Sequence, residues 1–322
     1  MTKRVLLIPD EPNWALDKNA KDLVKYNQSD LILDICYHQD FRRDSARYIK
    51  DYDLLFPMYK GIFFSLLKEG IPVDKCVTGI RSFFHWDHGV TVPPGYNARP
   101  PRKVIRRLKK AVLVNTHCKK LWYVFSPYLP VIHTKYTCDL ERYYPETKPQ
   151  RDKLVVGWAG SLTNHKGKRG FFEFIKPACE AVPGIELKVQ NKDDCFITSD
   201  AKMREFYTSL DLYISASRCE GTPRPVIEAA ACGVPVLSTD VGIVPELVEN
   251  EINGFIVERN VQAFVIVLEA MIKDRDRLKK MGQAIRTKME IEFNWHHLIW
   301  QWTDFLNYAL ELCKLKEKGY LR

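Results

Sequence analysis

The segment that decides the fold is Glu220-Gly221-Thr222-Pro223-Arg224-Pro225-Val226-Ile227-Glu228, which continues into Ala-Ala-Ala-Cys-Gly233-Val-Pro235-Val236. Gly221 permits a tight turn, and the two prolines preset backbone angles that suit the first turn of a helix. We therefore expect a loop that leads into a helix. The amides of Val226, Ile227 and Glu228 would then lack partners inside that helix.

Such a helix start attracts anions, because its unpaired amides and the helix dipole place partial positive charge there. The carboxylates of Glu220 and Glu228, on either side of the loop, are suited to accept hydrogen bonds from sugar hydroxyls. A ligand that carries both phosphate and sugar hydroxyls is a nucleotide sugar. From this segment alone, the alternative is an ordinary strand-to-helix turn with two solvated glutamates.

The neighbouring residues favour the nucleotide-sugar interpretation. Residues 211–217 and 235–239 read as short buried strands, and residues 242–257 as a loop, a short helix and a third strand. Over this stretch the chain strongly resembles the donor-binding half of glycosyltransferase family 4, which consists of retaining enzymes with the GT-B fold. The family pattern E-G-x-P-x-x-x-x-E-A-x-A-x-G-x-P-V is matched almost throughout, and in the following G-G-x-x-E motif Ile243 replaces the second glycine.

The order of apolar and amphipathic segments predicts an α/β protein with parallel sheets covered on both faces. The resemblance implies the GT-B arrangement, in which two Rossmann-like, doubly wound domains face a central cleft. In the first half we expect strands at 4–9, 31–37, 54–58, 76–84 and 111–115, and helices at 17–26, 42–52, 63–69, 102–110 and 119–125.

We place the domains at 1–148, an acceptor-binding Rossmann-like domain, and 149–294, a domain that binds the nucleotide sugar. The prolines Pro145 and Pro149 among polar residues mark the linker. Residues 295–322 resemble the terminal helix of the family, which crosses back onto the first domain. Its apolar stripe would be buried between the domains and contains Trp295, Ile299, Trp302, Leu306 and Ala309.

Size and composition suit two cores, because the chain has 322 residues and 46% hydrophobic residues. No apolar run approaches the length of a membrane span, and the amino-terminal stretch is too short for a signal peptide, so we expect a cytoplasmic protein. The nine cysteines show no metal-ligand spacing, and we expect reduced thiols, no disulfide framework, no metal and no cofactor.

The net charge of +9 is concentrated in the first half. Residues 1–150 contain 25 Lys and Arg against 16 Asp and Glu, whereas residues 151–322 contain 24 of each. The densest part runs from Arg102 to Lys120 and predicts a helix with a basic outer face. Its alternatives are a solvated helix face and a surface that attracts a polyanion, either an anionic membrane or nucleic acid.

The resemblance also assigns residues to the donor. The family holds the diphosphate with an arginine and a lysine in G-R-L-x-x-x-K-G, and here Ser161 stands at the arginine position, so we expect Lys166 and Arg169 to supply the cations together. Glu228 should bind the ribose hydroxyls and Glu220 should face the donor sugar. Further donor contacts are expected from the loop, the helix start and the base pocket: Gly221, Thr222, Pro223, Val226, Ile227, Gln190 and Tyr207.

On the acceptor side, the family brings a histidine from the first domain to the donor sugar. His85 fits that role best and is expected to be catalytic together with Glu220, with His88 in reserve near the acceptor. Where the family has a glycine pair after the first strand, this chain has Pro9-Asp10-Glu11-Pro12-Asn13-Trp14. Asp10 is suited to bond an acceptor hydroxyl, and Trp14 to stack on a sugar or base.

These observations lead to one main hypothesis and two alternatives. The main one is a retaining, metal-independent glycosyltransferase that moves a sugar from a nucleotide diphosphate sugar, a UDP-sugar rather than a GDP-sugar, to a glycan or lipid-linked precursor, with the protein at the inner face of a membrane. The first alternative is transfer to a hydroxylated DNA base, as in phage DNA glucosylation. The second is a non-catalytic scaffold that binds nucleotide or glycan, for which Ser161 is the argument.

Overall fold

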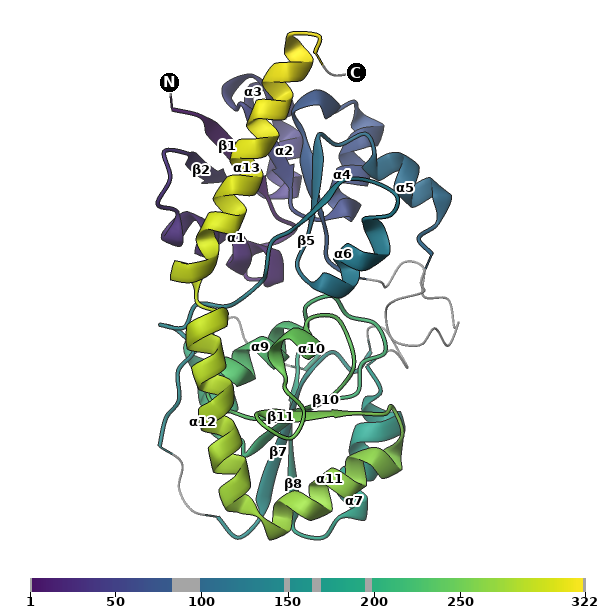
Figure 1. Cartoon of the computed structure of the whole chain (residues 1–322), viewed down its shortest axis with the longest axis vertical. Helices are drawn as coiled ribbons and strands as arrows, with labels where there is room; N and C mark the ends of the chain where they lie inside the picture. The colour runs from purple at the N-terminus through teal and green to yellow at the C-terminus, as the bar shows by residue number, and fades with distance from the viewer. Residues whose placement is uncertain (1, 83–98, 148–150, 164–168, 195–198, 321–322) are drawn as a thin grey trace. The chain divides into compact units, whose positions relative to one another are not determined.

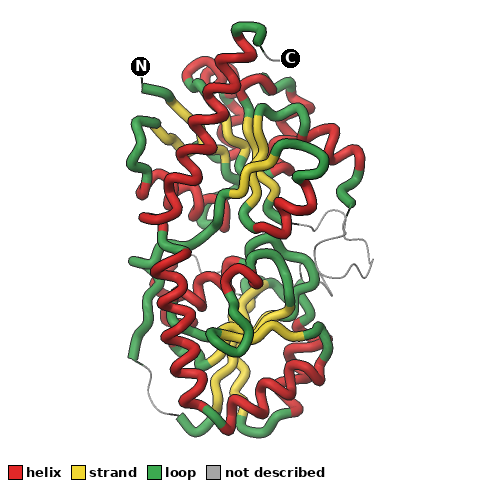
Figure 2. Tube along the Cα trace, in the orientation of Figure 1, coloured by secondary structure: helices red, strands yellow, loops and turns green. Residues whose placement is uncertain are grey.

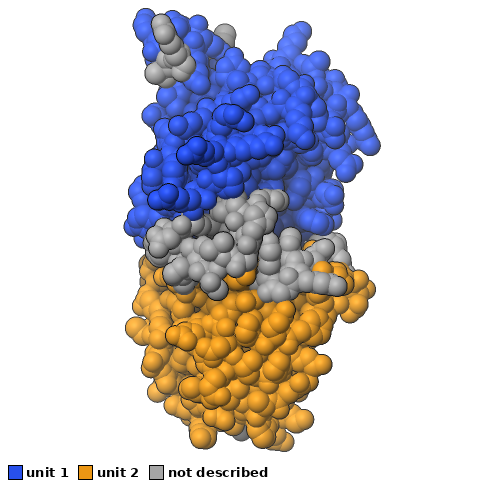
Figure 3. All heavy atoms as spheres, turned by 90° about the vertical axis from the view of Figure 1, so that its right-hand side faces the viewer, with its two compact units in different colours: residues 1–136, 295–322 blue, residues 137–294 orange. Residues whose placement is uncertain are grey.

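The structure is a computed structural model that describes residues 2–82, 99–147, 151–163, 169–194 and 199–320. The chain forms two compact units, coloured separately in Figure 3. Unit 1 comprises residues 1–136 and 295–322, and unit 2 comprises residues 137–294. Each unit consists of parallel strands flanked by helices, as the trace in Figure 2 shows.

Unit 1 contains two three-stranded parallel sheets with the orders β2-β1-β3 and β4-β5-β6. An isolated parallel bridge between Leu55 and Cys76 joins them, so the strands run β2-β1-β3-β4-β5-β6. Both faces of β1 are buried, which explains its unbroken apolar sequence. The strands are β1 (Arg4–Ile8), β2 (Ile32–Ile35), β3 (Leu54–Pro57), β4 (Val77–Ile80), β5 (Leu113–Thr116) and β6 (Val131–His133).

The helices of unit 1 alternate with these strands, apart from the last one, which comes from the end of the chain (Figure 1). The predicted helix at 42–52 is two short helices, because the backbone leaves the helical region at Asp44. The helices are α1 (Ala15–Tyr26), α2 (His38–Arg43), α3 (Ser45–Asp51), α4 (Lys60–Leu66), α5 (Arg102–Leu108), α6 (Lys119–Phe125) and α13 (Trp295–Glu317), with 3-10 turns η1 (Leu67–Glu69) and η2 (Val73–Lys75).

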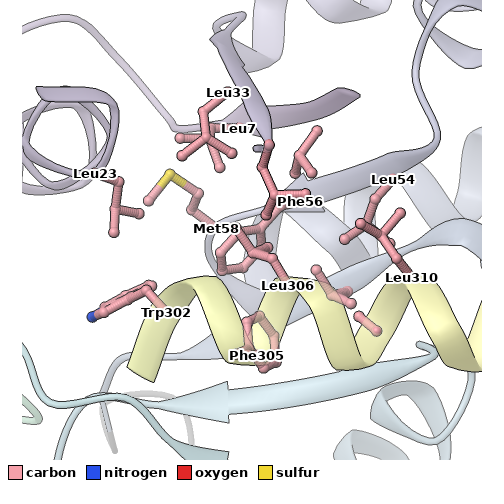
Figure 4. Close-up of a cluster of buried hydrophobic side chains, with 14 of the residues drawn as sticks. Leu7, Leu23, Leu33, Leu54, Phe56, Met58, Trp302, Phe305, Leu306 and Leu310 are labelled. Carbon is pink, nitrogen blue, oxygen red and sulfur yellow. The ribbon is translucent and has the colours of Figure 1, made fainter. Parts of the chain in front are cut away.

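The core of unit 1 lies between the sheet and the helices α1 and α13 (Figure 4). Phe56 of β3 packs against Phe305 of α13, with ring centroids 5.6 Å apart. The apolar stripe predicted for the terminal helix is buried in this core, and so it belongs to unit 1 itself rather than to a contact between domains. The stripe consists of Trp295, Ile299, Trp302, Leu306 and Ala309.

Unit 2 has one five-stranded parallel sheet with the order β11-β10-β9-β7-β8. The strands are β7 (Leu154–Gly160), β8 (Ile185–Asn191), β9 (Leu212–Ser215), β10 (Val236–Thr239) and β11 (Gly254–Val257). The helical elements are the π-helical turn η3 (Phe171–Ile175), α7 (Lys176–Ala181), α8 (Asp200–Thr208), α9 (Arg224–Ala231), α10 (Val244–Leu247), α11 (Val261–Lys273) and α12 (Arg275–Glu292).

Candidate functional site

The segment with the two glutamates lies at the point of the unit 2 sheet where the strand order reverses. β7 pairs with β8 on one side and with β9 on the other, so the connections that leave β7 and β9 run in opposite directions. Ligands of open parallel sheets bind at the carboxyl ends of the strands at such a point. The loop after β7 begins at Ser161, and the loop after β9 carries Glu220 and leads into α9.

Glu228 is buried in the second turn of α9 and is 3% exposed. Its Oε1 accepts a hydrogen bond from Nε of Arg224, one turn earlier, at 2.5 Å. Its Oε2 accepts one from the hydroxyl of Tyr207 on α8 at 2.8 Å. The carboxylate is therefore held at both oxygens, and each oxygen retains a lone pair for another donor.

Tyr207 lies elsewhere than expected. It was predicted to contribute to a nucleobase pocket, but its side chain is completely buried and its hydroxyl is used by Glu228. Its ring packs edge-on against Tyr213, with centroids 6.0 Å apart. Tyr207 therefore offers no face for a base to stack on, and it acts by positioning the carboxylate of Glu228.

Glu220 is the second buried carboxylate of the site and is 8% exposed. Its Oε1 lies 3.3 Å from Nη1 of Arg169, an ion pair without hydrogen-bond geometry at that oxygen. Burial raises the pKa of Glu220, and the charge of Arg169 opposes that shift. With Glu220 and Glu228 both buried, the alternative of two solvated glutamates is wrong.

Arg169 reaches Glu220 because the loops after β7 and β9 approach closely. Gly170, the next residue, has φ +68°, and a Cβ there would lie 2.7 Å from the carbonyl oxygen of Ala216. A side chain at this position would push the two loops apart. Lys166, the other predicted cation of the phosphate clamp, lies outside the described residues.

A second close approach shapes the turn at Gly221. Gly242 has φ +49°, and a Cβ on it would overlap the carbonyl oxygen of Gly221. That carbonyl accepts a hydrogen bond from the amide of Ile243 at 2.8 Å. The loop after β10 therefore packs against the turn at Gly221. Of the two glycines of the G-G-x-x-E motif, only the first, Gly242, is required for this contact.

The start of α9 differs in one respect from the expected anion site. The amide of Val226 donates to the carbonyl of Pro223 at 3.0 Å, so it is not one of the unpaired amides. The side chains of Val226 and Ile227 are fully buried in unit 2. Thr222, in contrast, is half-buried beside the turn. Val226 therefore offers a ligand neither its amide nor its side chain.

Ser161 also has a partner that the sequence did not predict. Its buried Oγ lies 2.7 Å from Oδ1 of Asp193, just after β8, and the amide of Thr163 donates to the same carboxylate at 2.8 Å. The hydroxyl of Ser161, followed by the amide of Thr163, lowers the pKa of Asp193 to about 2. Ser161 thus anchors its loop to the segment that follows β8. Gln190, near the end of β8, is half-buried.

Two charged residues of the site, Arg224 and Asp193, were not predicted from the sequence. Arg224 stands four residues before Glu228, and that helical spacing alone could have identified the pair. Asp193 gave no such signal, because its contact with Ser161 joins two loops 32 residues apart.

In unit 1, the predicted acceptor residues follow β1. Asp10 is half-buried, and burial raises the pKa of its carboxyl group. Its Oδ1 is buried and makes no hydrogen bond within the part of the chain that is described. Trp14 is 42% exposed directly before α1. His85 and His88 lie outside the described residues.

The basic segment 102–120 forms α5, a turn, β5 and the start of α6. Arg107 is half-buried, with its guanidinium carbon 5.2 Å from the centroid of the Phe64 ring. Lys120 is buried, so it does not belong to the basic surface that was predicted. The exposed cations of the segment are Arg102, Lys103, Arg106, Lys109, Lys110 and Lys119.

Neither a metal cluster nor a membrane span was found in the described ranges. No three His, Cys, Asp or Glu side chains among those residues are grouped so that they could hold a metal ion. None of the helices there has the length and apolar character needed to cross a bilayer.

Comparison with known proteins supports this fold. Residues 185–288 match the family model described as glycosyl transferases group 1, and the match includes both glutamates. The chain has the GT-B fold: it superimposes on sucrose-phosphate synthase from Thermosynechococcus elongatus with a TM-score of 0.76, at 13% identity over 96% of this chain and 99% of that chain. For Anabaena HepE in complex with UDP-glucose the TM-score is 0.70, at 14% identity over 95% and 99%.

Curated relatives add a sequence likeness to glycosyltransferases. The capsular polysaccharide biosynthesis glycosyltransferase CapM of Staphylococcus aureus is 24% identical over 50% of this chain and 47% of its own length. The lipopolysaccharide core biosynthesis mannosyltransferase LpsB of Rhizobium meliloti is 37% identical over 26% of this chain and 24% of its own. The chain thus spans less than half the length of these two relatives.

Proposed function

We propose that this protein is a retaining, metal-independent glycosyltransferase of family 4 whose unit 2 binds a nucleotide diphosphate sugar. The observation that carries the proposal is the pair of buried carboxylates, Glu220 and Glu228, at the strand reversal of the unit 2 sheet. Buried carboxylates are costly unless they are paired, and both are held by arginines. Such preorganised polar groups in a dry site are typical of a ligand-binding centre.

Within this proposal, Glu228 accepts hydrogen bonds from the two ribose hydroxyls of the donor. Arg224 and Tyr207 keep its carboxylate in place, and its remaining lone pairs are free for the ribose. The loop from Gly221 to Pro223 contacts the sugar and the phosphates.

The chemical step requires stabilisation of two developing charges. Negative charge grows on the departing diphosphate, and Arg169, together with Lys166, is the cation proposed to stabilise it. Positive charge grows at the anomeric carbon, where the carboxylate of Glu220 is suited to act. The acceptor hydroxyl then attacks on the face that the diphosphate leaves, with His85 of unit 1 as the proposed catalytic histidine.

A UDP-sugar is the favoured donor, because the HepE structures of the same fold contain UDP and UDP-glucose. A glycan or lipid-linked acceptor is supported by CapM and LpsB, whose names refer to capsular polysaccharide and lipopolysaccharide core. The exposed cations of segment 102–120 are proposed to attract an anionic membrane, which would place the enzyme at the inner face as a peripheral cytoplasmic protein. Neither the fold nor these likenesses favour the DNA or the scaffold alternative.

The proposal is tested by donor binding and turnover. UDP-, GDP- and dTDP-sugars are compared by thermal shift, since a donor at 100 times its dissociation constant stabilises by about 2.7 kcal/mol. The variant Glu228→Gln is expected to weaken binding of the active donor at least tenfold. Glu180→Gln is the matched control, because this glutamate is exposed on α7.

Slow hydrolysis of the bound donor without acceptor is the expected activity. If nucleotide binds but neither hydrolysis nor transfer occurs, the scaffold alternative replaces the proposal. If none of the nucleotide sugars binds, or if Glu228→Gln leaves binding unchanged, the assignment of unit 2 as the donor domain is wrong.

A further inference from the structure

Unit 1 contains a buried arginine whose charged end lacks partners. Arg81 follows β4 directly and is 8% exposed. Its Nε donates a hydrogen bond to the carbonyl of Met58, just after β3, at 2.8 Å. Nη1 and Nη2 are both buried, and among the described residues neither has a hydrogen-bond partner. These two nitrogens carry four of the five N–H groups of a guanidinium.

The surroundings of this guanidinium are apolar. Its carbon lies 5.9 Å from the ring centroid of Phe56 and 5.8 Å from that of Trp302, two members of the unit 1 core. The side chain folds back over Gly79, where a Cβ would overlap the guanidinium, so the glycine provides the room that it occupies. Burial lowers the pKa of Arg81 to about 9, which leaves the group charged at neutral pH.

A second buried cation stands beside Arg81. Lys60 is 2% exposed at the start of α4, and its Nζ lies 3.0 Å from the hydroxyl of Tyr59. Burial, and then the charge of Arg81, lower the pKa of Lys60 to about 7. The two side chains are therefore close enough to repel each other, although nothing in an apolar core favours bringing two cations together.

Among the described residues, the other ionisable groups near Arg81 do not offset its charge: Tyr136 favours the charged form, but burial outweighs this effect. Burial and the charge of Arg81 lower the pKa of His117, so this imidazole is neutral at physiological pH. Burial raises the pKa of Asp10, and the side-chain charges that act on it come from Glu11 and Asp17. A buried cation without a counter-charge destabilises a fold, and an apolar side chain of similar size would serve packing better. This cost indicates a ligand that supplies the missing charge.

We propose that the carboxyl edge of the unit 1 sheet binds a phosphate group between Arg81 and Lys60. This edge, where β3 and β4 end next to each other, is where parallel sheets of this type bind ligands. The planar guanidinium matches two phosphate oxygens, and a lysine adds a point charge. On binding, the guanidinium rotates from the two rings toward the edge, so that Nη1 and Nη2 gain the partners they lack. If the proposed function holds, this phosphate belongs to the acceptor, which is then a phosphorylated or diphosphate-linked glycan precursor.

The experiment measures phosphate binding to the full chain without any donor. Melting temperature and heat of binding are followed with sodium phosphate, and with sodium acetate or sodium chloride at equal ionic strength. We expect phosphate to raise the Tm of the wild type, with a much smaller effect of acetate and none of chloride. In Arg81→Met the Tm in chloride should be higher than in the wild type, because an unpaired charge is gone, and the response to phosphate should fall at least tenfold.

The matched control is Arg275→Met, which removes a half-buried arginine of unit 2 that donates to the backbone carbonyls of Arg151 and Asp152 and has no part in the proposed donor site. This variant should keep the phosphate response, and Arg81→Met should keep the thermal shift caused by UDP. Should Arg81→Met not fold, Lys60→Met takes its place and should weaken the phosphate response in the same direction.

Three results would overturn the inference. The first is a wild type whose Tm does not depend on phosphate while Arg81→Met is less stable in chloride, because Arg81 is then purely structural. The second is a phosphate response that disappears in Arg169→Met, which lacks the proposed diphosphate cation of unit 2, and persists in Arg81→Met. The third is an acetate response as large as that of phosphate. Loss of donor binding or of transfer alone would instead count against the proposed function and leave the phosphate site in place.

Discussion

The hydroxyl of Tyr207 can be removed without changing the shape of the site. In Tyr207→Phe, Oε2 of Glu228 loses the hydrogen bond that it accepts at 2.8 Å, while the ring remains in its buried position. Arg224 still holds Oε1. The substitution therefore tests whether Tyr207 positions the carboxylate or merely fills space.

The expected loss of stability follows from the negative charge of the Glu228 carboxylate, which accepts the hydrogen bond. A buried hydrogen bond to a charged group contributes about 1.5–3 kcal/mol, so Tyr207→Phe should lower the free energy of unfolding by that amount. Tyr213→Phe is the matched control, because Tyr213 is equally buried but its hydroxyl lies 3.3 Å from the neutral carbonyl of Ala159. For that variant the loss should be about 0.5–1.5 kcal/mol.

The assay combines guanidinium unfolding with donor titration. Besides the loss of stability, Tyr207→Phe should bind the active donor about tenfold more weakly, a difference of about 1.4 kcal/mol, because Glu228 can turn away from the ribose. Tyr213→Phe should leave donor affinity unchanged. Equal effects of the two variants on both quantities would refute the reasoning, since the charge on Glu228 would then make no difference.

Three further perturbations have expected outcomes. Lys60→Met should change the pH dependence of stability. In the folded protein the pKa of Lys60 lies at about 7, whereas in the unfolded chain the lysine keeps its proton up to its ordinary pKa. In chemical unfolding, the wild type should therefore gain about 2 kcal/mol of stability relative to the variant between pH 7 and pH 9. Gly242→Ala should cost about 3 kcal/mol or more and weaken donor binding, because its Cβ would overlap the carbonyl of Gly221 at a φ of +49°; a variant with wild-type Tm would contradict this. In Glu220→Gln the cost of ionising a buried carboxyl group is gone, so the wild type should lose stability relative to the variant as the pH rises through the raised pKa of Glu220, and a constant difference from pH 4 to pH 8 would disagree.

The local pattern of apolar and polar residues was sufficient to predict most of the strands and helices. The buried strands from Arg4 onward read as apolar runs, and their alternation with amphipathic helices predicted parallel sheets covered by helices. The GT-B arrangement was implied by the family resemblance. Where the local signal was weak, the prediction failed. β6 has three residues and was not predicted, and the break at Asp44 between α2 and α3 has no glycine or proline to mark it.

The sequence was sufficient to locate the candidate site but not to predict the contacts of its two glutamates. Glu220 and Glu228 stand in a motif, and their positions at the strand reversal agree with it. Their partners come from distant segments: Tyr207 precedes Glu228 by 21 residues, and Arg169 precedes Glu220 by a larger distance along the chain. Arg81 could not have been singled out, because within a predicted strand nothing distinguishes a buried arginine from an exposed one. Such contacts depend on how loops from different strands meet.

The packing of α13 has a consequence for biosynthesis. Unit 2 is continuous in sequence, whereas the core of unit 1 needs Trp302, Phe305 and Leu306 from the end of the chain. A ribosome therefore makes the first 136 residues long before their hydrophobic partner helix exists. Domains usually fold in the order of translation, but here the middle of the polypeptide should acquire its native structure first. The nascent amino-terminal part would meanwhile expose apolar sheet surface until α13 has been synthesised.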